Sequence, residues 1–177
     1  YENEHIKSVS VQDQLTGNTV HVRAAAVVNA TGPWVDTLRD LDKSKFGKRL
    51  HLTKGVHIVV PQEKLPIKQA LYFDVPDGRM IFAIPRGRTT YIGTTDTDYK
   101  GDIEEVHTTR DDAEYLINAV NETFPTVKLV LNDIESSWAG LRPLIHEEGK
   151  SASELSRKDE IFISKSGLIS IAGGKLT

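Results

Sequence analysis

An arginine within an apolar segment is the first residue whose type and setting point to chemistry. Arg142 lies in the stretch 138–144, Trp-Ala-Gly-Leu-Arg-Pro-Leu, which otherwise reads as a strand. A guanidinium in such surroundings needs an anionic partner, and its planar fork matches the oxygens of a carboxylate or a phosphate. A structural salt bridge explains Arg142 equally well at this point, because ion pairs and ligand sites look alike in a sequence.

Two further basic side chains share one apolar segment. Lys54 and His57 lie between Leu50 and Val60, and an unbroken strand would point them to opposite faces. A bulge at Gly55, where glycine indicates a bulge or a close backbone approach, would bring them to the same side. A lone histidine on such a strand is more often a packed residue than a catalyst, so the residues alone leave its role open.

Other candidates follow predicted strands. Lys175 comes after Gly173 and Gly174, and glycines directly after a strand let the backbone approach a ligand closely. A solvent-exposed lysine after a turn is the plainer explanation. Arg157 lies in a polar stretch, where a surface position is favoured. The hydroxyl and carboxylate side chains at 94–97 suit either hydrogen bonding to a ligand or capping of a turn.

The first part of the chain suits a nucleotide-binding layer. Alternating apolar residues around a turn at 16–18 predict a β-hairpin, and the apolar run 24–30 predicts a strand covered on both faces. Thr31 and Gly32 then lead into a helix with Pro33 in its first turn. In an α/β sheet such a turn presents backbone to a nucleotide, although an ordinary strand-to-helix turn is an equal alternative.

The middle of the chain is rich in strands, which we place at 50–60, 70–73, 80–84 and 90–94. Short turns between the last three predict an antiparallel meander. A helix is expected from Thr109 to Phe124, with later strands at 134–144, 160–164 and 168–172. The chain thus begins and ends with pieces of one layer and holds a separate antiparallel sheet between them.

Composition limits the classes of partner. The 177 residues include 22 basic and 25 acidic side chains, for a net charge of -3, which gives no polybasic footprint for nucleic acid or anionic lipid. Cysteine is absent, so disulfides, thiolate nucleophiles and zinc-thiolate sites are excluded. The histidines lack metal-ligand spacing, and we assign no metal. No apolar run is long enough for a membrane span.

Five segments together form a specific ordered set. They are 28–35 (Val-Asn-Ala-Thr-Gly-Pro-Trp-Val), 54–61 (Lys-Gly-Val-His-Ile-Val-Val-Pro), 92–101 (Ile-Gly-Thr-Thr-Asp-Thr-Asp-Tyr-Lys-Gly), 140–144 (Gly-Leu-Arg-Pro-Leu) and 172–177 (Ala-Gly-Gly-Lys-Leu-Thr). In this order the chain resembles the FAD-dependent glycerol-3-phosphate dehydrogenases and the related α-glycerophosphate oxidases.

The resemblance implies an α+β fragment of an α/β FAD-binding oxidoreductase, with a fold like that of D-amino-acid oxidase. Residues 1–45 and 147–177 would belong to the FAD-binding domain, and 46–146 would form an antiparallel substrate-binding domain. The resemblance also implies that FAD is the cofactor and lies near two groups of residues: Ala30, Thr31 and Gly32, and Gly173, Gly174, Lys175, Leu176 and Thr177.

The implied reaction is oxidation of sn-glycerol 3-phosphate to dihydroxyacetone phosphate, with hydride transfer to FAD. Arg142, Arg157 and Lys175 match positions expected to hold the substrate phosphate or its neighbouring hydroxyls, and we place Lys54 with them. His57 matches a histidine near the carbinol carbon and is, with Arg142, a candidate catalytic residue. Cations would fix and orient the substrate while a base or water takes the hydroxyl proton.

The sequence departs from the family pattern at both ends, since the amino-terminal Gly-x-Gly-x-x-Gly turn and the carboxy-terminal helix do not occur in it. We expect the fragment by itself to be inactive and to bind FAD weakly or not at all. Two alternatives stay open: another flavin oxidoreductase of this fold acting on an amine or hydroxy acid, and a stand-alone β-rich binding module.

The electron acceptor of the intact enzyme is expected to be quinone or oxygen. Its expected location is the cytoplasm, where peripheral association with the inner face of the cell membrane is left open, as is the oligomeric state.

Overall fold

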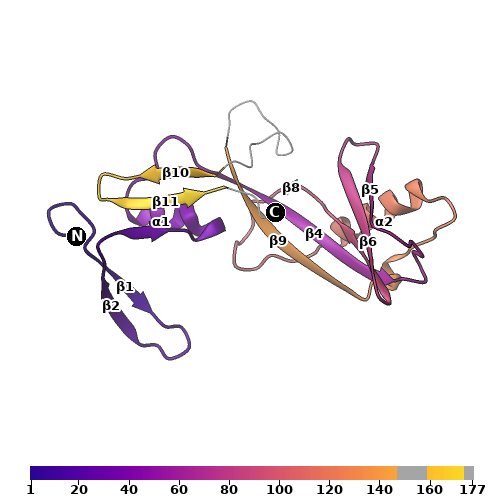
Figure 1. The fold of residues 1–177 in the computed structure, drawn as a ribbon, viewed down its shortest axis with the longest axis horizontal. Helices are drawn as coiled ribbons and strands as arrows, with labels where there is room; N and C mark the ends of the chain where they lie inside the picture. The colour runs from indigo at the N-terminus through magenta and orange to yellow at the C-terminus, as the bar shows by residue number, and fades with distance from the viewer. Residues whose placement is uncertain (147–158, 174–177) are drawn as a thin grey trace. The chain divides into compact units, whose positions relative to one another are not determined.

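The computed structural model describes residues 1–146 and 159–173, which form two compact units (Figure 1). Unit 1 comprises Tyr1–His51 and Pro143–Thr177, and unit 2 comprises Leu52–Arg142. Strands β4 (Leu50–Pro61) and β9 (Ser136–Ile145) cross the unit boundaries. The expectations for Arg157, Gly174, Lys175, Leu176 and Thr177 fall outside the described residues.

Unit 1 contains a hairpin and a three-stranded sheet. Strands β1 (Ser8–Gln12) and β2 (Thr19–Arg23) pair antiparallel, as the alternating apolar pattern predicted. The second sheet has the order β10 (Glu160–Ile163), β11 (Leu168–Ala172), β3 (Val27–Asn29). Its strand β11 runs antiparallel to β10 and parallel to β3. The predicted final hairpin is therefore confirmed, and it joins the early strand in one sheet.

The turn after β3 is tighter than predicted. A 3-10 turn, η1 (Gly32–Trp34), comes first, and helix α1 (Val35–Leu41) follows it. Pro33 sits in the first turn, where its missing N–H costs nothing. The buried side chains of Val35, Ile145 and Ala172 form a small core for this unit.

Unit 2 is an antiparallel sheet covered by one helix. The sheet order is β5 (Leu71–Asp74), β6 (Met80–Arg86), β7 (Thr89–Gly93), β4, β8 (Thr97–Asp98), and β9 also pairs with β4. The predicted antiparallel meander is confirmed in β5, β6 and β7. Strand β8 is a short addition that the sequence did not predict.

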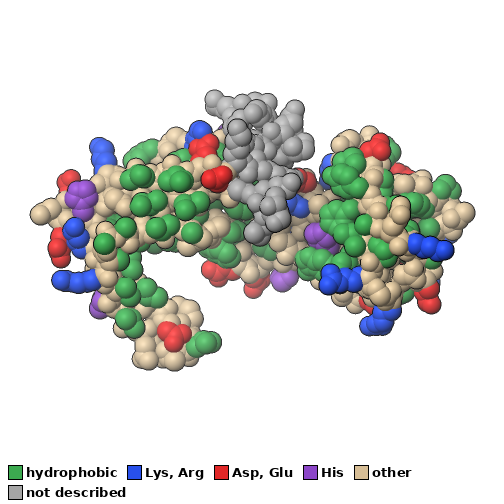
Figure 2. All heavy atoms as spheres, viewed as in Figure 1, with side chains coloured by type: hydrophobic (Ala, Val, Ile, Leu, Met, Phe, Trp, Pro, Cys, Tyr) green, Lys and Arg blue, Asp and Glu red, His purple; other side chains and the backbone are tan. Residues whose placement is uncertain are grey.

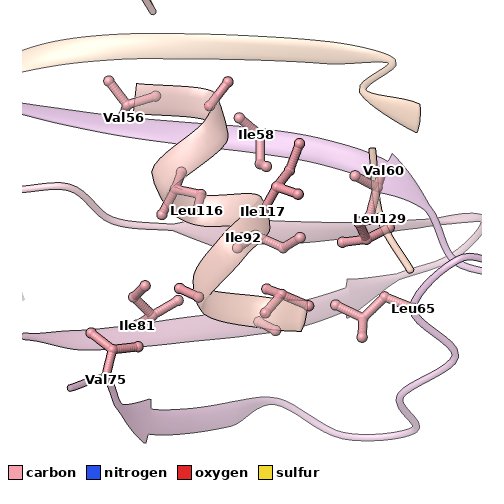
Figure 3. Close-up of a cluster of buried hydrophobic side chains, with 14 residues drawn as sticks. Val56, Ile58, Val60, Leu65, Val75, Ile81, Ile92, Leu116, Ile117 and Leu129 are labelled. Carbon is pink, nitrogen blue, oxygen red and sulfur yellow. The ribbon is translucent and has the colours of Figure 1, made fainter. Parts of the chain in front are cut away.

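Helix α2 (Arg110–Thr123) packs on one face of this sheet, and the 3-10 turn η2 (Leu131–Asp133) follows it. Figure 3 shows Leu116 and Ile117 of the helix beside Val56 and Ile58 of β4, all within one buried apolar cluster. Alternate residues of β4 point to this core because side chains alternate between the faces of a strand.

Charges on the molecular surface are mixed. On the face shown in Figure 2, Lys and Arg side chains are scattered among acidic ones rather than gathered in one patch. No helix among residues 1–146 and 159–173 is long and apolar enough to cross a membrane.

Candidate functional site

The sheet face of unit 2 that points away from α2 carries the predicted chemistry. On β9, Trp138, Gly140 and Arg142 alternate with Ala139, which packs against the apolar core. On β4, His57 lies on this same face because Val56 and Ile58 point to the core. The pairing of β9 with β4 brings Arg142 and His57 together on one surface.

The guanidinium of Arg142 is held by the segment that follows β7. Its Nη1 donates to the carbonyl of Thr95 at 3.2 Å and lies 3.4 Å from Oδ1 of Asp96, and its Nη2 donates to Oγ1 of Thr94 at 2.9 Å. The Arg142 side chain is 26% exposed. A fork held by several partners is oriented in advance, which suits recognition of a planar or tetrahedral anion.

The close backbone approach predicted at Gly55 occurs, and its partner is Arg142. A Cβ built on Gly55 would lie 2.4 Å from both terminal nitrogens of the guanidinium. Glycine is therefore needed here for the guanidinium to rest against β4.

The bulge lies on the neighbouring segment and not at Gly55. Lys54 pairs with Thr97 and His57 pairs with Gly93, so three residue steps on β4 (54 to 57) face four on the neighbour (93 to 97). The extra residue falls within 94–96, which is the segment that holds Arg142. The strand β4 itself is continuous, so Lys54 and His57 point to opposite faces.

Thr95 fastens this bulged segment to β4. It is buried, and its Oγ1 accepts a hydrogen bond from the Val56 N–H at 3.0 Å and donates one to the Lys54 carbonyl at 3.2 Å. From the sequence, the side chains at 94–97 could either bind a ligand or cap a turn. The structure gives Thr95 a third role, because it fixes the backbone that carries the partners of Arg142.

The imidazole of His57 lies between aromatic rings. It stacks on Trp138 with ring centroids 4.9 Å apart and planes at 10°, and it lies 5.4 Å from Phe82. A Cβ built on Gly93 would lie 2.4 Å from its Cδ2, so glycine at 93 makes room for the ring. Sequence reasoning missed Gly93, because it read as the end of a strand.

The protonation of His57 is shifted by its surroundings. Its Nδ1 is buried and has no hydrogen-bond partner in the part of the chain that the structure describes. Burial, and then the positive charge of Arg142, lower the pKa of the imidazole below its usual value. The ring is therefore neutral at pH 7 and able to accept a proton.

Lys54 is engaged on the other side of the sheet. Its Nζ forms an ion pair with Oδ2 of Asp112 at 2.5 Å, and the two side chains are 10% and 7% exposed. Asp112 also accepts hydrogen bonds from the backbone and hydroxyl of Thr109, the N-cap residue of α2. Although burial alone would raise the pKa of Asp112, Lys54 and Thr109 lower it. The structure therefore ties Lys54 to the start of α2 and does not bring it to His57.

Unit 1 places two glycine turns at one sheet edge. The parallel strands β3 and β11 end side by side, with Asn29 opposite Ser170. Gly32 and Gly173 follow these strands and have φ of 59° and 77°, which favour glycine. Buried Asn29 links the start of α1 to β11 through its Nδ2, which donates to the Val35 carbonyl and to Ser170 Oγ. This is the carboxyl edge at which α/β sheets bind nucleotides.

The turn after β3 offers open backbone at that edge. No described atom outside residues 31–33 lies within 4 Å of a Cβ built on Gly32, and Thr31 Oγ1 donates to Asn29 Oδ1 at 2.8 Å. Ala30, Thr31, Gly32 and Gly173 thus fit the approach of a flavin nucleotide. Residues 1–146 and 159–173 contain no group of three or more His, Asp or Glu side chains placed to hold a metal ion.

Known proteins resemble the chain over its whole length. The family model described as "FAD dependent oxidoreductase" (DAO) matches residues 1–177. The aerobic glycerol-3-phosphate dehydrogenase of Bacillus subtilis (strain 168) is 59% identical over 177 residues, which are 100% of this chain and 32% of that protein. The enzyme of the same name from Staphylococcus haemolyticus is 56% identical over 97% of this chain and 31% of its own length. The chain thus spans about a third of these relatives.

Solved structures agree with this result. The glycerol-3-phosphate dehydrogenase from Bacillus halodurans, solved with FAD, matches with a TM-score of 0.89 and 55% identity over 99% of this chain and 34% of its own. Glycine oxidase from Bacillus cereus matches at a TM-score of 0.57 and 19% identity, covering 98% of this chain and 42% of its own, and shows the fold alone. The predicted fold class, that of D-amino-acid oxidase, is confirmed.

Proposed function

The chain belongs to the FAD dependent oxidoreductase family, and we propose that it is part of an FAD-dependent glycerol-3-phosphate dehydrogenase. The complete protein oxidises sn-glycerol 3-phosphate to dihydroxyacetone phosphate. The observation that carries the proposal is the identity of 55–59% to dehydrogenases of that name along the whole chain. Because the chain spans about a third of them, the activity belongs to the complete protein.

Unit 1 contributes to the flavin domain and unit 2 to the substrate domain. The turn of Ala30, Thr31 and Gly32, together with Gly173, holds FAD through its backbone. The same role for residues 174–177 rests on the family resemblance alone, because these residues lie outside the described part of the chain. When bound, the flavin supplies the hydride acceptor of the reaction. The two glycines with positive φ and the open space at Gly32 support this assignment.

Arg142 binds the phosphate of the substrate. The dianion gains charge-assisted hydrogen bonds from a guanidinium that Thr95 and Asp96 already hold in place. Because the fork does not have to be ordered on binding, less conformational entropy is lost. The proposed roles of Arg157 and Lys175 in binding the substrate phosphate rest on the family resemblance alone, because both residues lie outside the described part of the chain.

His57 takes the proton of the substrate hydroxyl. The lowered pKa keeps the imidazole neutral at pH 7, which is the form that accepts a proton. Stacking on Trp138 fixes the plane of the ring, and the buried Nδ1 lacks a partner among the described residues. Lys54 is left out of this site because its charge is engaged by Asp112.

The acceptor and the location complete the proposal. Reduced flavin passes its electrons to quinone or oxygen, and the protein acts in the cytoplasm, where peripheral association with the inner face of the cell membrane is left open. Comparing oxygen consumption with reduction of a soluble quinone by the complete protein distinguishes the two acceptors.

A second candidate is a flavin oxidoreductase of the same fold that acts on an amine or hydroxy acid. The observation that favours it is Arg142 itself, because a guanidinium fork binds a carboxylate as well as a phosphate.

Substrate turnover by the complete protein tests both candidates. The protein is purified with its flavin, and bleaching of the flavin absorbance is followed with glycerol 3-phosphate, glycine and lactate. We expect bleaching with glycerol 3-phosphate alone. If glycine or lactate bleached the flavin and glycerol 3-phosphate did not, the second candidate would replace the proposal.

A further inference from the structure

Three glycines lie on or beside the face that carries His57 and Arg142, and the chain itself explains two of them. At Gly55 a side chain would collide with the Arg142 guanidinium, and at Gly93 it would collide with the His57 ring. At Gly140, in contrast, no described atom outside residues 139–141 lies within 4 Å of a built Cβ.

The backbone does not explain Gly140 either. Gly140 does not have the positive φ that favours glycine over other residues. It lies in the interior of β9, where glycine is less stable than alanine because the unfolded chain gains more freedom. A glycine that neither packing nor conformation requires marks a place where something outside the described chain approaches closely.

The position of Gly140 identifies what approaches. It lies between Trp138, which stacks on His57, and Arg142, which covers Gly55. Gly55 and His57 are two residues apart on β4, or about 7 Å along a strand. A small molecule bound to Arg142 at one end and to His57 at the other therefore passes over or beside Gly140.

We propose that Gly140 is a specificity-determining residue, against whose bare backbone the carbon chain of the substrate packs. The inference rests on the proposed function, in which Arg142 holds the phosphate and His57 the hydroxyl. A Cβ at 140 would enter the space assigned to the three-carbon body, and no described atom outside residues 139–141 lies within 4 Å of it. The bare backbone at Gly140 therefore leaves room for the carbon chain of a short phosphate ester that spans Arg142 and His57.

Kinetics of the complete, flavin-loaded enzyme test this role with Gly140→Ala and Gly140→Val. We expect Gly140→Val to raise KM for glycerol 3-phosphate roughly tenfold or more, and Gly140→Ala to raise it less, because each added methyl group removes space from the substrate. Flavin content and Tm should match those of the wild type. The inhibition constant of inorganic phosphate should change much less, because phosphate occupies only the Arg142 end.

Ser136→Val is the matched control, since Ser136 is exposed on the same strand and four residues before Gly140; its KM should stay at the wild-type value. An unchanged KM in Gly140→Val would overturn the inference. So would loss of flavin or a lowered Tm in both Gly140 variants, because flavin or another protein segment would then occupy the space. Failure of the proposed function is seen separately, as a wild-type enzyme that does not oxidise glycerol 3-phosphate.

Discussion

The guanidinium of Arg142 rests on the backbone of Gly55, so close that a Cβ at position 55 would lie 2.4 Å from both terminal nitrogens. The two residues come from β9 and β4 and are far apart in the sequence. The guanidinium of Arg142 on β9 can take this orientation only because residue 55 on β4 is a glycine. The proposed phosphate-binding geometry therefore depends on Gly55 as much as on Arg142.

Gly55→Ala should displace the guanidinium from the partners that hold it and lower kcat/KM. The expected loss is about tenfold to a hundredfold, since misplacing a positioning contact by an ångström costs that much. In an Arg142→Met background, Gly55→Ala should lower kcat/KM little further, because there is no guanidinium left to displace. Equal effects in both backgrounds would show that Gly55 acts without Arg142.

Arg142→Met should lower kcat/KM for glycerol 3-phosphate at least about a hundredfold, because a charge-assisted contact to the dianion is lost. Flavin should stay bound, which absorbance of the purified variant measures. Arg142→Lys should recover only part of the loss, because an ammonium lacks the planar fork. Unchanged kinetics in Arg142→Met would remove this residue from the site.

The acid side of the pH profile should report His57. Burial and then the charge of Arg142 lower the pKa of His57, and a base works only when it is deprotonated. The kcat/KM of the wild type should therefore rise with pH through a pKa below the usual value of about 6.5 for histidine. In Arg142→Met the residual activity should rise at a higher pH, whereas Arg142→Lys should keep the wild-type position.

The sign of the stability effect follows from the same shift. A histidine whose pKa is lower in the folded state binds fewer protons there than in the unfolded chain. The contribution of His57 to the free energy of unfolding is therefore fully present above the usual histidine pKa of about 6.5. It falls as the pH drops from there towards the pKa that His57 has in the folded state. In His57→Asn this part of the acid destabilisation should disappear, and the Tm measured at several pH values between neutral and mildly acidic checks it.

Lys54→Met tests the structural role of the buried ion pair with Asp112. Removing one partner leaves a buried carboxylate uncompensated and should lower the free energy of unfolding by about 3 kcal/mol. KM should not change, because the ammonium lies on the face opposite His57. Lys64→Met is the matched control: its pair with Asp133 has a lysine that is 49% exposed, and the loss should stay below about 1 kcal/mol. If Lys54→Met raised KM and left the free energy of unfolding unchanged, Lys54 would have to be assigned to substrate binding.

Local patterns predicted the elements well, because they report local physics. The alternation in β4 and the spacing along α2 specified which side chains face the core. The pattern also placed Lys54 and His57 on opposite faces, provided that β4 was unbroken. The sequence could not say whether Gly55 carried a bulge, since the extra residue is at 94–96, on a neighbouring segment.

Non-local pairing accounts for what the sequence could not predict. Arg142 and His57 meet because β9 pairs with β4, and no local pattern in either strand specifies that partner. The stack of His57 on Trp138 depends on the same pairing. For Arg142 the sequence left ion pair and ligand site as equal alternatives, and the structure shows the ion pair with Asp96 at the place where a ligand site is proposed.

Gly32→Ala should weaken flavin binding by the complete protein. Gly32 has φ of 59°, and no described atom lies within 4 Å of a built Cβ, so the substitution strains the backbone and places a methyl group in the space assigned to FAD. The strain alone costs about 1 kcal/mol. Gly17→Ala is the matched control, because Gly17 has φ of 73° and equally open surroundings in the β1–β2 turn. We expect flavin loss on dialysis in Gly32→Ala alone; equal retention by both variants would move FAD away from this turn.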